Sequence, residues 1–268
     1  MTITSDSALY DSTGRTHETD GDDPIKGVRV AITGGTSGLG LALVRELLGR
    51  GARVAFVART RERVEQVARE GRGAHGIVGD VSSREDIYPI AVQVVGSLGG
   101  LDVLINNASD LGPVPLQMLS DTECEDLERA FSTNVTGPFR LTKALMGALA
   151  ASAREGRGAV VLNITSDAAV NPYPGWGAYG ASKAALHHLS RIWGEEHAAD
   201  GVRFLSLDPG DMDTPMHAAA VPDADPTTLK RPETSASELA DAIAQALPGR
   251  GASGVPLTTV SELEGATR

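Results

Sequence analysis

Residues 28–50 read VRVAITGGTSGLGLALVRELLGR. The first six residues are rich in β-branched side chains and are typical of a buried strand, and LALVRELLGR has the apolar spacing of a helix. Glycines at positions 34, 38 and 40 lie between them, where backbone N–H groups can approach a phosphate closely. The stretch favours a strand–loop–helix unit that binds a dinucleotide, although its glycine spacing differs from G-x-G-x-x-G. A tight strand-to-helix turn without a ligand is the alternative.

The alternation of strand and helix patterns continues along the chain. Continuous apolar runs indicate further strands at 52–58, 74–81, 101–109, 159–166, 202–210 and 254–260. Helical spacing indicates helices at 41–50, 61–70, 84–98, 121–150, 179–197 and 235–247. Fully apolar strands that alternate with helices are typical of a parallel sheet covered on both faces. We therefore predict an α/β fold, a single doubly wound domain of about seven strands.

Two segments depart from this alternation. Residues 1–24 are polar and acidic, which favours a disordered tail ahead of one catalytic domain at 25–268. Residues 211–234 contain four prolines, at 215, 222, 226 and 232. A long segment of this kind is more typical of a substrate loop or lid than of core structure.

The composition excludes several classes of protein. The chain has 268 residues, 41% of them hydrophobic, and a formal net charge of −11, which repels nucleic acid and anionic lipid. No apolar run reaches the roughly 18 residues of a membrane span, so a cytoplasmic protein is predicted. The single cysteine, Cys124, excludes an internal disulfide framework. His187 and His188 lack the spacing of metal ligands, so no metal site is expected.

Further motifs follow in a fixed order. They are Asn106-Asn107-Ala108, Asn134, Ser166, Tyr179-x-x-x-Lys183 and Pro209-Gly210. Together with Thr33-Gly34-Gly35-Thr36-Ser37-Gly38-Leu39-Gly40, this chain resembles the short-chain dehydrogenases/reductases from about Ile25 to Val260. The resemblance implies a Rossmann-like fold, a nicotinamide cofactor and assembly into a homodimer or homotetramer through the helices that begin near Asp121 and Tyr179.

Tyr179 and Lys183 are four residues apart and therefore share one helix face. A tyrosine that exchanges a proton near neutral pH needs its pKa lowered by about three units, roughly 4 kcal/mol. An ammonium group about 4 Å away supplies around that much, so we expect Lys183 to lower the pKa of Tyr179. The resemblance implies that Lys183 also binds the nicotinamide ribose and that Ser166 donates a hydrogen bond to the substrate oxygen. It implies that Asn134 anchors a water in a proton relay; a purely structural Asn134 that bends its helix is the alternative.

The residue after the second strand distinguishes the two nicotinamide cofactors, because a carboxylate there favours NAD and an arginine favours NADP. Ala58 stands at that place and Arg59 follows it, so NADP(H) is predicted, unless Arg59 is simply a solvated residue at the helix start. The resemblance also assigns an adenine contact to Asp80 and Val81. The full set of predicted cofactor-binding residues is Gly34, Thr36, Ser37, Gly38, Leu39, Gly40, Arg59, Asp80, Val81, Asn107, Ala108, Tyr179, Lys183, Pro209, Gly210 and Thr214.

The positions where the family meets its substrate carry carboxylates in this chain. Asp110, Asp167, Asp211 and Asp213 stand there, beside Ser166 and Tyr179. A lipid pocket would usually present apolar side chains, so a polar substrate is predicted, such as an aminated sugar or cyclitol. The alternative is that these carboxylates cap helices or face water.

The predicted activity is therefore a ketoreductase that interconverts a ketone and a secondary alcohol with NADP(H), with Tyr179 as proton donor and acceptor. Two alternatives remain. An epimerase or dehydratase that acts through a transient ketone uses the same Tyr-Lys chemistry, and a non-catalytic NADP-sensing module uses the same fold.

Overall fold

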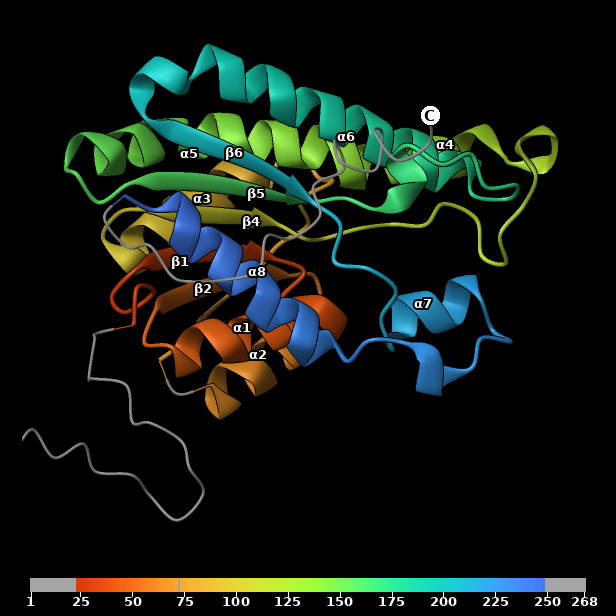
Figure 1. The fold of residues 1–268 in the computed structure, drawn as a ribbon, viewed down its shortest axis with the longest axis horizontal. Helices are drawn as coiled ribbons and strands as arrows, with labels where there is room; N and C mark the ends of the chain where they lie inside the picture. The colour runs from red at the N-terminus through yellow and green to blue at the C-terminus, as the bar shows by residue number, and fades with distance from the viewer. Residues whose placement is uncertain (1–22, 72, 249–268) are drawn as a thin grey trace, which may run out of the picture.

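The structure, a computed structural model, describes residues 23–71 and 73–248. These residues form one sheet of six parallel strands in the order β3-β2-β1-β4-β5-β6 (Figure 1). The strands are β1 (Arg29–Thr33), β2 (Arg53–Ala58), β3 (His75–Val78), β4 (Val103–Asn106), β5 (Ala159–Ile164) and β6 (Val202–Leu207). The predicted doubly wound α/β fold is confirmed. The seventh predicted strand, at 254–260, lies outside the described residues, as do residues 1–22 of the predicted tail.

Helices cover both faces of the sheet (Figure 1). One face carries α1 (Gly38–Gly49), α2 (Arg61–Glu70) and α8 (Pro232–Ala246), and the other carries α3 (Ile87–Leu98), α5 (Gly137–Arg154) and α6 (Gly177–Glu196). Side chains of a strand alternate between these two cores, because successive residues point to opposite faces. Within β1, Val30 and Ile32 pack on the α1 side and Ala31 packs on the α3 side.

Two segments differ from the predicted elements. The helix predicted at 121–150 consists of α4 (Cys124–Phe131), a π-helical turn (Ser132–Thr136) and α5. The segment 211–234, predicted to be a loop, contains the short helix α7 (Pro215–Ala220), which begins at a proline and is capped by Thr214. Proline is favoured at the first position of a helix, since its missing N–H would be unpaired there.

A buried ion-pair network fixes the amino end of the sheet. The carboxylate of Asp102, which is 1% exposed, accepts hydrogen bonds from Arg29 Nη2 at 2.6 Å and Arg157 Nη2 at 2.8 Å. Burial alone would raise the pKa of Asp102, but the bonds from Arg157, Arg29 and Ser152 outweigh it and hold the pKa well below its usual range.

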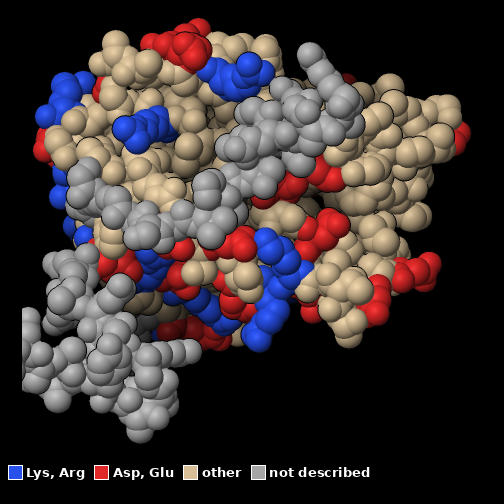
Figure 2. All heavy atoms as spheres, viewed as in Figure 1, with Lys and Arg blue, Asp and Glu red and all other residues tan. Residues whose placement is uncertain are grey.

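Within the described residues, no helix combines the length and the apolar character that crossing a membrane requires. On the face shown in Figure 2, lysine and arginine side chains are interspersed with aspartate and glutamate. The face shown therefore has no extended basic surface, as expected for a chain with a net charge of −11.

Candidate active site

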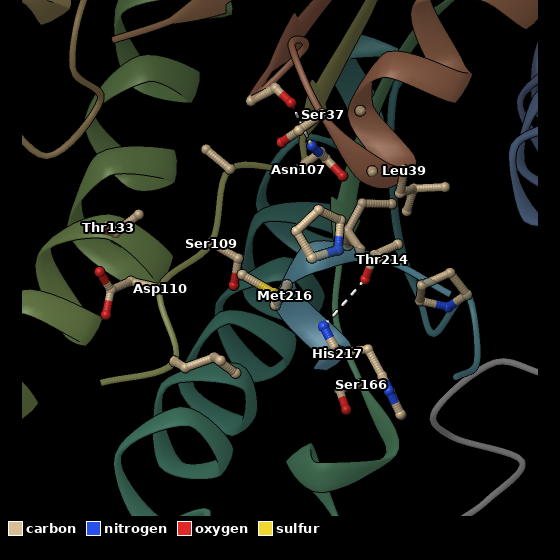
Figure 3. Close-up of a pocket in the computed structure, with 18 of the residues that line it drawn as sticks. Ser37, Leu39, Asn107, Ser109, Asp110, Thr133, Ser166, Thr214, Met216 and His217 are labelled. Carbon is tan, nitrogen blue, oxygen red and sulfur yellow. Dashed lines mark hydrogen bonds between the residues drawn. The ribbon is translucent and has the colours of Figure 1, made fainter. Parts of the chain in front are cut away.

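A cavity of about 620 Å³ lies at the carboxyl end of the sheet. Residues that follow all six strands line it, and it spans the point where the strand order reverses, between β1 and β4. In open α/β sheets this switch point is the usual place for a ligand. Every residue predicted to bind the cofactor lines the cavity. Figure 3 shows Ser37 and Leu39 of the glycine loop facing it together with Asn107 and Thr214.

The glycine loop is held tightly against the loop after β4. A Cβ atom on Gly40 would lie 2.1 Å from the carbonyl oxygen of Gly34 and 2.6 Å from Asn107 Nδ2, so no larger residue fits. Asn107 Nδ2 donates to the carbonyl of Thr33 at 2.9 Å, and Thr33 Oγ1 accepts from the backbone N–H of Ala108 at 3.0 Å. These bonds fix the entrance to α1.

The amino end of α1 retains donors for an anion. Its N-cap, Ser37, makes no side-chain capping hydrogen bond, and the three residues that follow it line the cavity. The first N–H groups of a helix have no partner within the helix, and the helix dipole favours negative charge there. The loop therefore fits a pyrophosphate.

The end of the cavity where the adenosine is predicted to lie carries two arginines. Arg59 and Arg63 both line it, beside Ala58 and Thr60. Arg63 was missed in the sequence analysis. The sequence does contain a pattern that could have indicated it: arginines at 59, 61 and 63 lie at the start of α2. The helix dipole disfavours cations there unless an anion binds. Asp80 also lines the cavity, and its Oδ1 accepts from the Ser82 hydroxyl at 2.7 Å.

The structure brings Ser166, Tyr179 and Lys183 to one wall of the cavity. Ser166 follows the end of β5, and the other two lie in the first turns of α6. A Cβ on Gly180 would lie 2.8 Å from the carbonyl oxygen of Ala168, so this glycine lets α6 pack close to the segment that carries Ser166. Lys183 Nζ donates to the carbonyl of Ile164 at 2.8 Å and lies 5.4 Å from the centre of the Tyr179 ring.

The predicted net lowering of the Tyr179 pKa is wrong for this structure. Burial raises the pKa of Tyr179 above its ordinary value, and the hydrogen bond with Ser166 offsets only part of this rise. The charges of Asp208 and Asp167 raise the pKa of Tyr179 further, and burial lowers the pKa of Lys183 itself to about 8. The helical spacing correctly predicted that the two side chains are neighbours. The direction of the pKa shift, however, is decided by the desolvation of both groups.

Asn134 lies beneath the cavity and does not line it. Its side chain is fully buried in the π-helical turn, where Oδ1 accepts from the backbone N–H of Asp110 at 2.8 Å. Its Nδ2 donates to the carbonyl of Asp110 and to Ser182 Oγ, both at 2.8 Å. Asn134 therefore holds the loop after β4, and its predicted part in a proton relay stays a prediction.

Three of the four predicted substrate carboxylates line the cavity. Asp110, Asp167 and Asp211 do so, whereas Asp213 is exposed and lies outside the lining. Asp110 is partly neutralised by Arg129 Nε at 3.3 Å, and Asp167 accepts a hydrogen bond from the Tyr173 hydroxyl at 2.6 Å. Asp167 and Asp211 are therefore the better candidates for a substrate contact.

Besides Arg63, Asp208 and His217 are titratable residues of the cavity that were not singled out from the sequence. Asp208 directly precedes Pro209-Gly210, a motif that drew attention only to its proline and glycine. His217 lies in α7, where its backbone N–H donates to Thr214 Oγ1 at 3.2 Å (Figure 3). Neither carries a sequence pattern of its own, since both reach the cavity through the fold of residues 208–221.

Fold and site together define a doubly wound α/β protein in which a glycine loop and a Ser-Tyr-Lys group line one cavity. The profile of the short chain dehydrogenases matches residues 29–225. The chain belongs to the short-chain dehydrogenase family.

Three relatives illustrate the breadth of this similarity. An uncharacterized oxidoreductase of Mycobacterium tuberculosis is 34% identical over 229 residues, which are 82% of this chain and 65% of the relative's length. A 3-ketoacyl-(acyl-carrier-protein) reductase of Brucella melitensis, solved with NADH, is 28% identical with a TM-score of 0.76, covering 84% of this chain and 92% of the other. A variant of an actinorhodin polyketide ketoreductase, solved with NADPH, is 28% identical with a TM-score of 0.72, covering 81% and 90%.

Proposed function

We propose that the protein is an NADPH-dependent oxidoreductase that interconverts a ketone and a secondary alcohol on a small polar substrate. The observation that supports this most is the presence of Ser166, Tyr179 and Lys183 on one wall of the cavity that the glycine loop also lines. A polar substrate carbonyl beside Tyr179 would thus lie next to the bound cofactor. The family's assembly into dimers or tetramers and a cytoplasmic location are part of the same proposal.

The chain's own residues account for the proton chemistry. When bound, NADPH supplies the hydride that reaches the carbonyl carbon. The Ser166 hydroxyl donates a hydrogen bond to the carbonyl oxygen, and Tyr179 delivers the proton that this oxygen needs to become a hydroxyl. The buried Lys183 ammonium stabilises the phenolate that remains, because opposite charges attract strongly where water is excluded. In the reverse direction Tyr179 accepts the alcohol proton.

A spectrophotometric screen tests the activity. The purified full chain is mixed with NADPH and a panel of small polar ketones, and the loss of NADPH absorbance is followed. Oxidation of NADPH with formation of the matching alcohol is the expected result. Isomerised substrate without net loss of NADPH would indicate an epimerase, and tight NADPH binding without turnover of any carbonyl would indicate a sensor; either result contradicts the proposal.

The preference for NADPH is proposed from Arg59 and Arg63, which line the cavity beside Ala58 at the end of β2, where the adenosine ribose is expected. Replacing Arg59→Ala should raise the Kd for NADPH by about 10- to 100-fold, the loss of one charge-assisted hydrogen bond pair to a phosphate. The Kd for NADH should change little, because NADH carries no such phosphate. Fluorescence titration measures both constants.

Arg61→Ala is the matched control, since Arg61 is the first residue of α2, two residues after Arg59, and is not part of the cavity lining. It should leave both constants near those of the wild type. Equal weakening of NADPH and NADH by Arg59→Ala would contradict the proposed cofactor preference.

The proposed substrate carries an amine, as an aminated sugar or cyclitol does. Asp167 and Asp211 both face the cavity near Tyr179, and their charges act on the neighbouring Asp208. Replacing Asp167→Asn should raise the KM for an amine-bearing ketone by about 10-fold, the worth of one charge-assisted contact. The KM for the same ketone with a hydroxyl in place of the amine should stay within about twofold.

Asp223→Asn serves as the control, because Asp223 is an exposed carboxylate of the same segment as Asp211 and does not line the cavity. Steady-state kinetics with the two matched ketones gives KM and kcat separately. An equal rise in KM for both ketones would show that Asp167 does not recognise the amine.

A further inference from the structure

Asp208 follows the strand position against which Lys183 is held. Lys183 Nζ donates to the carbonyl of Ile164 at 2.8 Å, and Ile164 on β5 pairs with Leu207 on β6, the residue directly before Asp208. His187 Nδ1 lies 3.0 Å from Ser206 Oγ, which fixes the two elements against each other. α6 starts at the cavity and runs antiparallel to β6. Two residues toward the cavity along β6 span roughly 6.6 Å, and four residues toward the cavity along α6 span roughly 6 Å, so Asp208 and Lys183 lie at the same level. Asp208 lies two residues after Ser206, directly beyond the end of β6, and Lys183 lies about one turn before His187 on α6. Both Asp208 and Lys183 line the cavity.

The carboxylate of Asp208 accepts a backbone hydrogen bond but has no cationic partner among the described residues. Its Oδ1 accepts the backbone N–H of Gly210 at 2.9 Å. Among the described residues, no lysine or arginine nitrogen lies within 4.0 Å of it. Burial raises the pKa of Asp208, and the nearby Asp167 and Asp211 raise it further. A half-buried negative charge thus stands beside the Tyr179–Lys183 pair.

The charge of Asp208 acts on both members of that pair. It raises the pKa of Lys183 against the lowering by burial, and it adds to the rise that burial imposes on Tyr179. The other titratable groups that face the pair come from the neighbouring elements: Asp167 after β5, Asp211 after β6, Tyr173 through its bond to Asp167, and His217 from α7. Of these, only Asp208 changes the pKa of Lys183.

We propose that Asp208 is a positioning residue whose negative charge keeps Lys183 as an ammonium and Tyr179 as a neutral phenol in the working pH range. The inference rests on the proposed function, in which Tyr179 gives the proton and Lys183 stabilises the remaining phenolate. Without that charge, both groups lose their protons at lower pH. Ketone reduction needs both protons, so the decline of its rate with rising pH then begins at a lower pH.

A direct titration of Lys183 tests this without any substrate. The chain has four lysines, at 26, 143, 183 and 230, so a protein labelled with ¹³Cε-lysine gives few NMR signals. A Lys183→Met variant assigns the signal of Lys183, and its pKa is measured in the full chain. The wild type should titrate at about 8. Asp208→Asn should titrate about one unit lower, the usual size of one lost neighbouring charge.

Asparagine still accepts the Gly210 N–H, so Asp208→Asn removes the charge and keeps the hydrogen bond. Asp208→Glu should restore the pKa of Lys183 to within about 0.3 units, since it restores the charge. Asp223→Asn, which removes an exposed carboxylate outside the cavity, should leave it unchanged. An equal pKa of Lys183 in wild type and Asp208→Asn would overturn the proposal, whether or not the protein reduces ketones.

The pH profile of NADPH oxidation provides the second measurement. With Asp208→Asn, the alkaline decline of kcat for ketone reduction should begin about one pH unit lower than in the wild type, and Asp208→Glu should reverse this. A merely structural role of Asp208 would change kcat at all pH values and leave the midpoint in place, which would contradict the inference. Absence of NADPH oxidation in every variant, including the wild type, would instead count against the proposed function.

Discussion

Tyr179→Phe is expected to lower kcat for ketone reduction by at least about a hundredfold while the Kd for NADPH changes by less than about threefold. Phenylalanine keeps the ring, which packs edge-on against Trp176 with centroids 5.7 Å apart, and removes only the hydroxyl. General acid catalysis contributes about 10²- to 10⁴-fold, and the proposed proton donor is the Tyr179 hydroxyl, which is hydrogen-bonded to Ser166. Stopped-flow or steady-state loss of NADPH absorbance gives kcat, and fluorescence titration gives the Kd.

Tyr88→Phe is the matched control, because Tyr88 is 73% exposed on α3 and does not line the cavity. Its kcat should equal that of the wild type. Retention of more than a tenth of the wild-type kcat by Tyr179→Phe would assign the proton transfer to another group.

The second large effect is expected from Gly40→Ala. The added methyl group would lie 2.1 Å from the carbonyl oxygen of Gly34 and 2.6 Å from Asn107 Nδ2, so the loop between β1 and α1 must move. Overpacking of this kind costs about 1–3 kcal/mol of the free energy of unfolding. Because the displaced N–H groups are those proposed to bind the pyrophosphate, the Kd for NADPH should rise by at least about a hundredfold.

Gly49→Ala in the same helix is its control. Gly49 is the last residue of α1 and a Cβ there would meet nothing within 4 Å, so alanine should leave the Kd unchanged and stabilise the helix by about 0.5–1 kcal/mol. Denaturant unfolding and NADPH titration of the two variants give both quantities. Unchanged NADPH binding by Gly40→Ala would show that the loop does not hold the cofactor.

The alternation of strands and helices could be predicted because each element carries its own local pattern. Residues 61–70 form α2 as predicted, since the apolar Val64 and Val67 recur on one face. The cavity-lining residues were also predictable where a strand ends in a recognisable motif, as with Asn107 after β4 and Ser166 after β5. In a parallel sheet, all such ends meet at one edge.

Features that depend on tertiary contacts could not be predicted. Asp211 lines the cavity and Asp213 does not, because the segment turns where Met212 bridges to Lys230 and Asp213 N donates to the Lys230 carbonyl at 2.9 Å. No pattern in the sequence specifies that pairing. The π-helical turn at Asn134 likewise follows from the bonds of its side chain to the backbone of Asp110.

The electrostatics of Tyr179 show the same limit. Helical spacing correctly predicted that Lys183 is its neighbour, but the direction of the pKa shift depends on burial by residues from several elements and on the charge of Asp208. Desolvation outweighs a single interaction when both groups are nearly inaccessible to water.

The proposed reaction is the passage of a hydride from NADPH to a carbonyl carbon beside Tyr179. It is tested most directly with NADPH deuterated at either of the two C4 positions of the nicotinamide and the ketone that reacts fastest in the screen. One of the two labelled cofactors should deliver one deuterium to the carbinol carbon for each NADPH oxidised, as seen by mass spectrometry and NMR. An alcohol without deuterium from either cofactor, in the presence of bound NADPH, would contradict it.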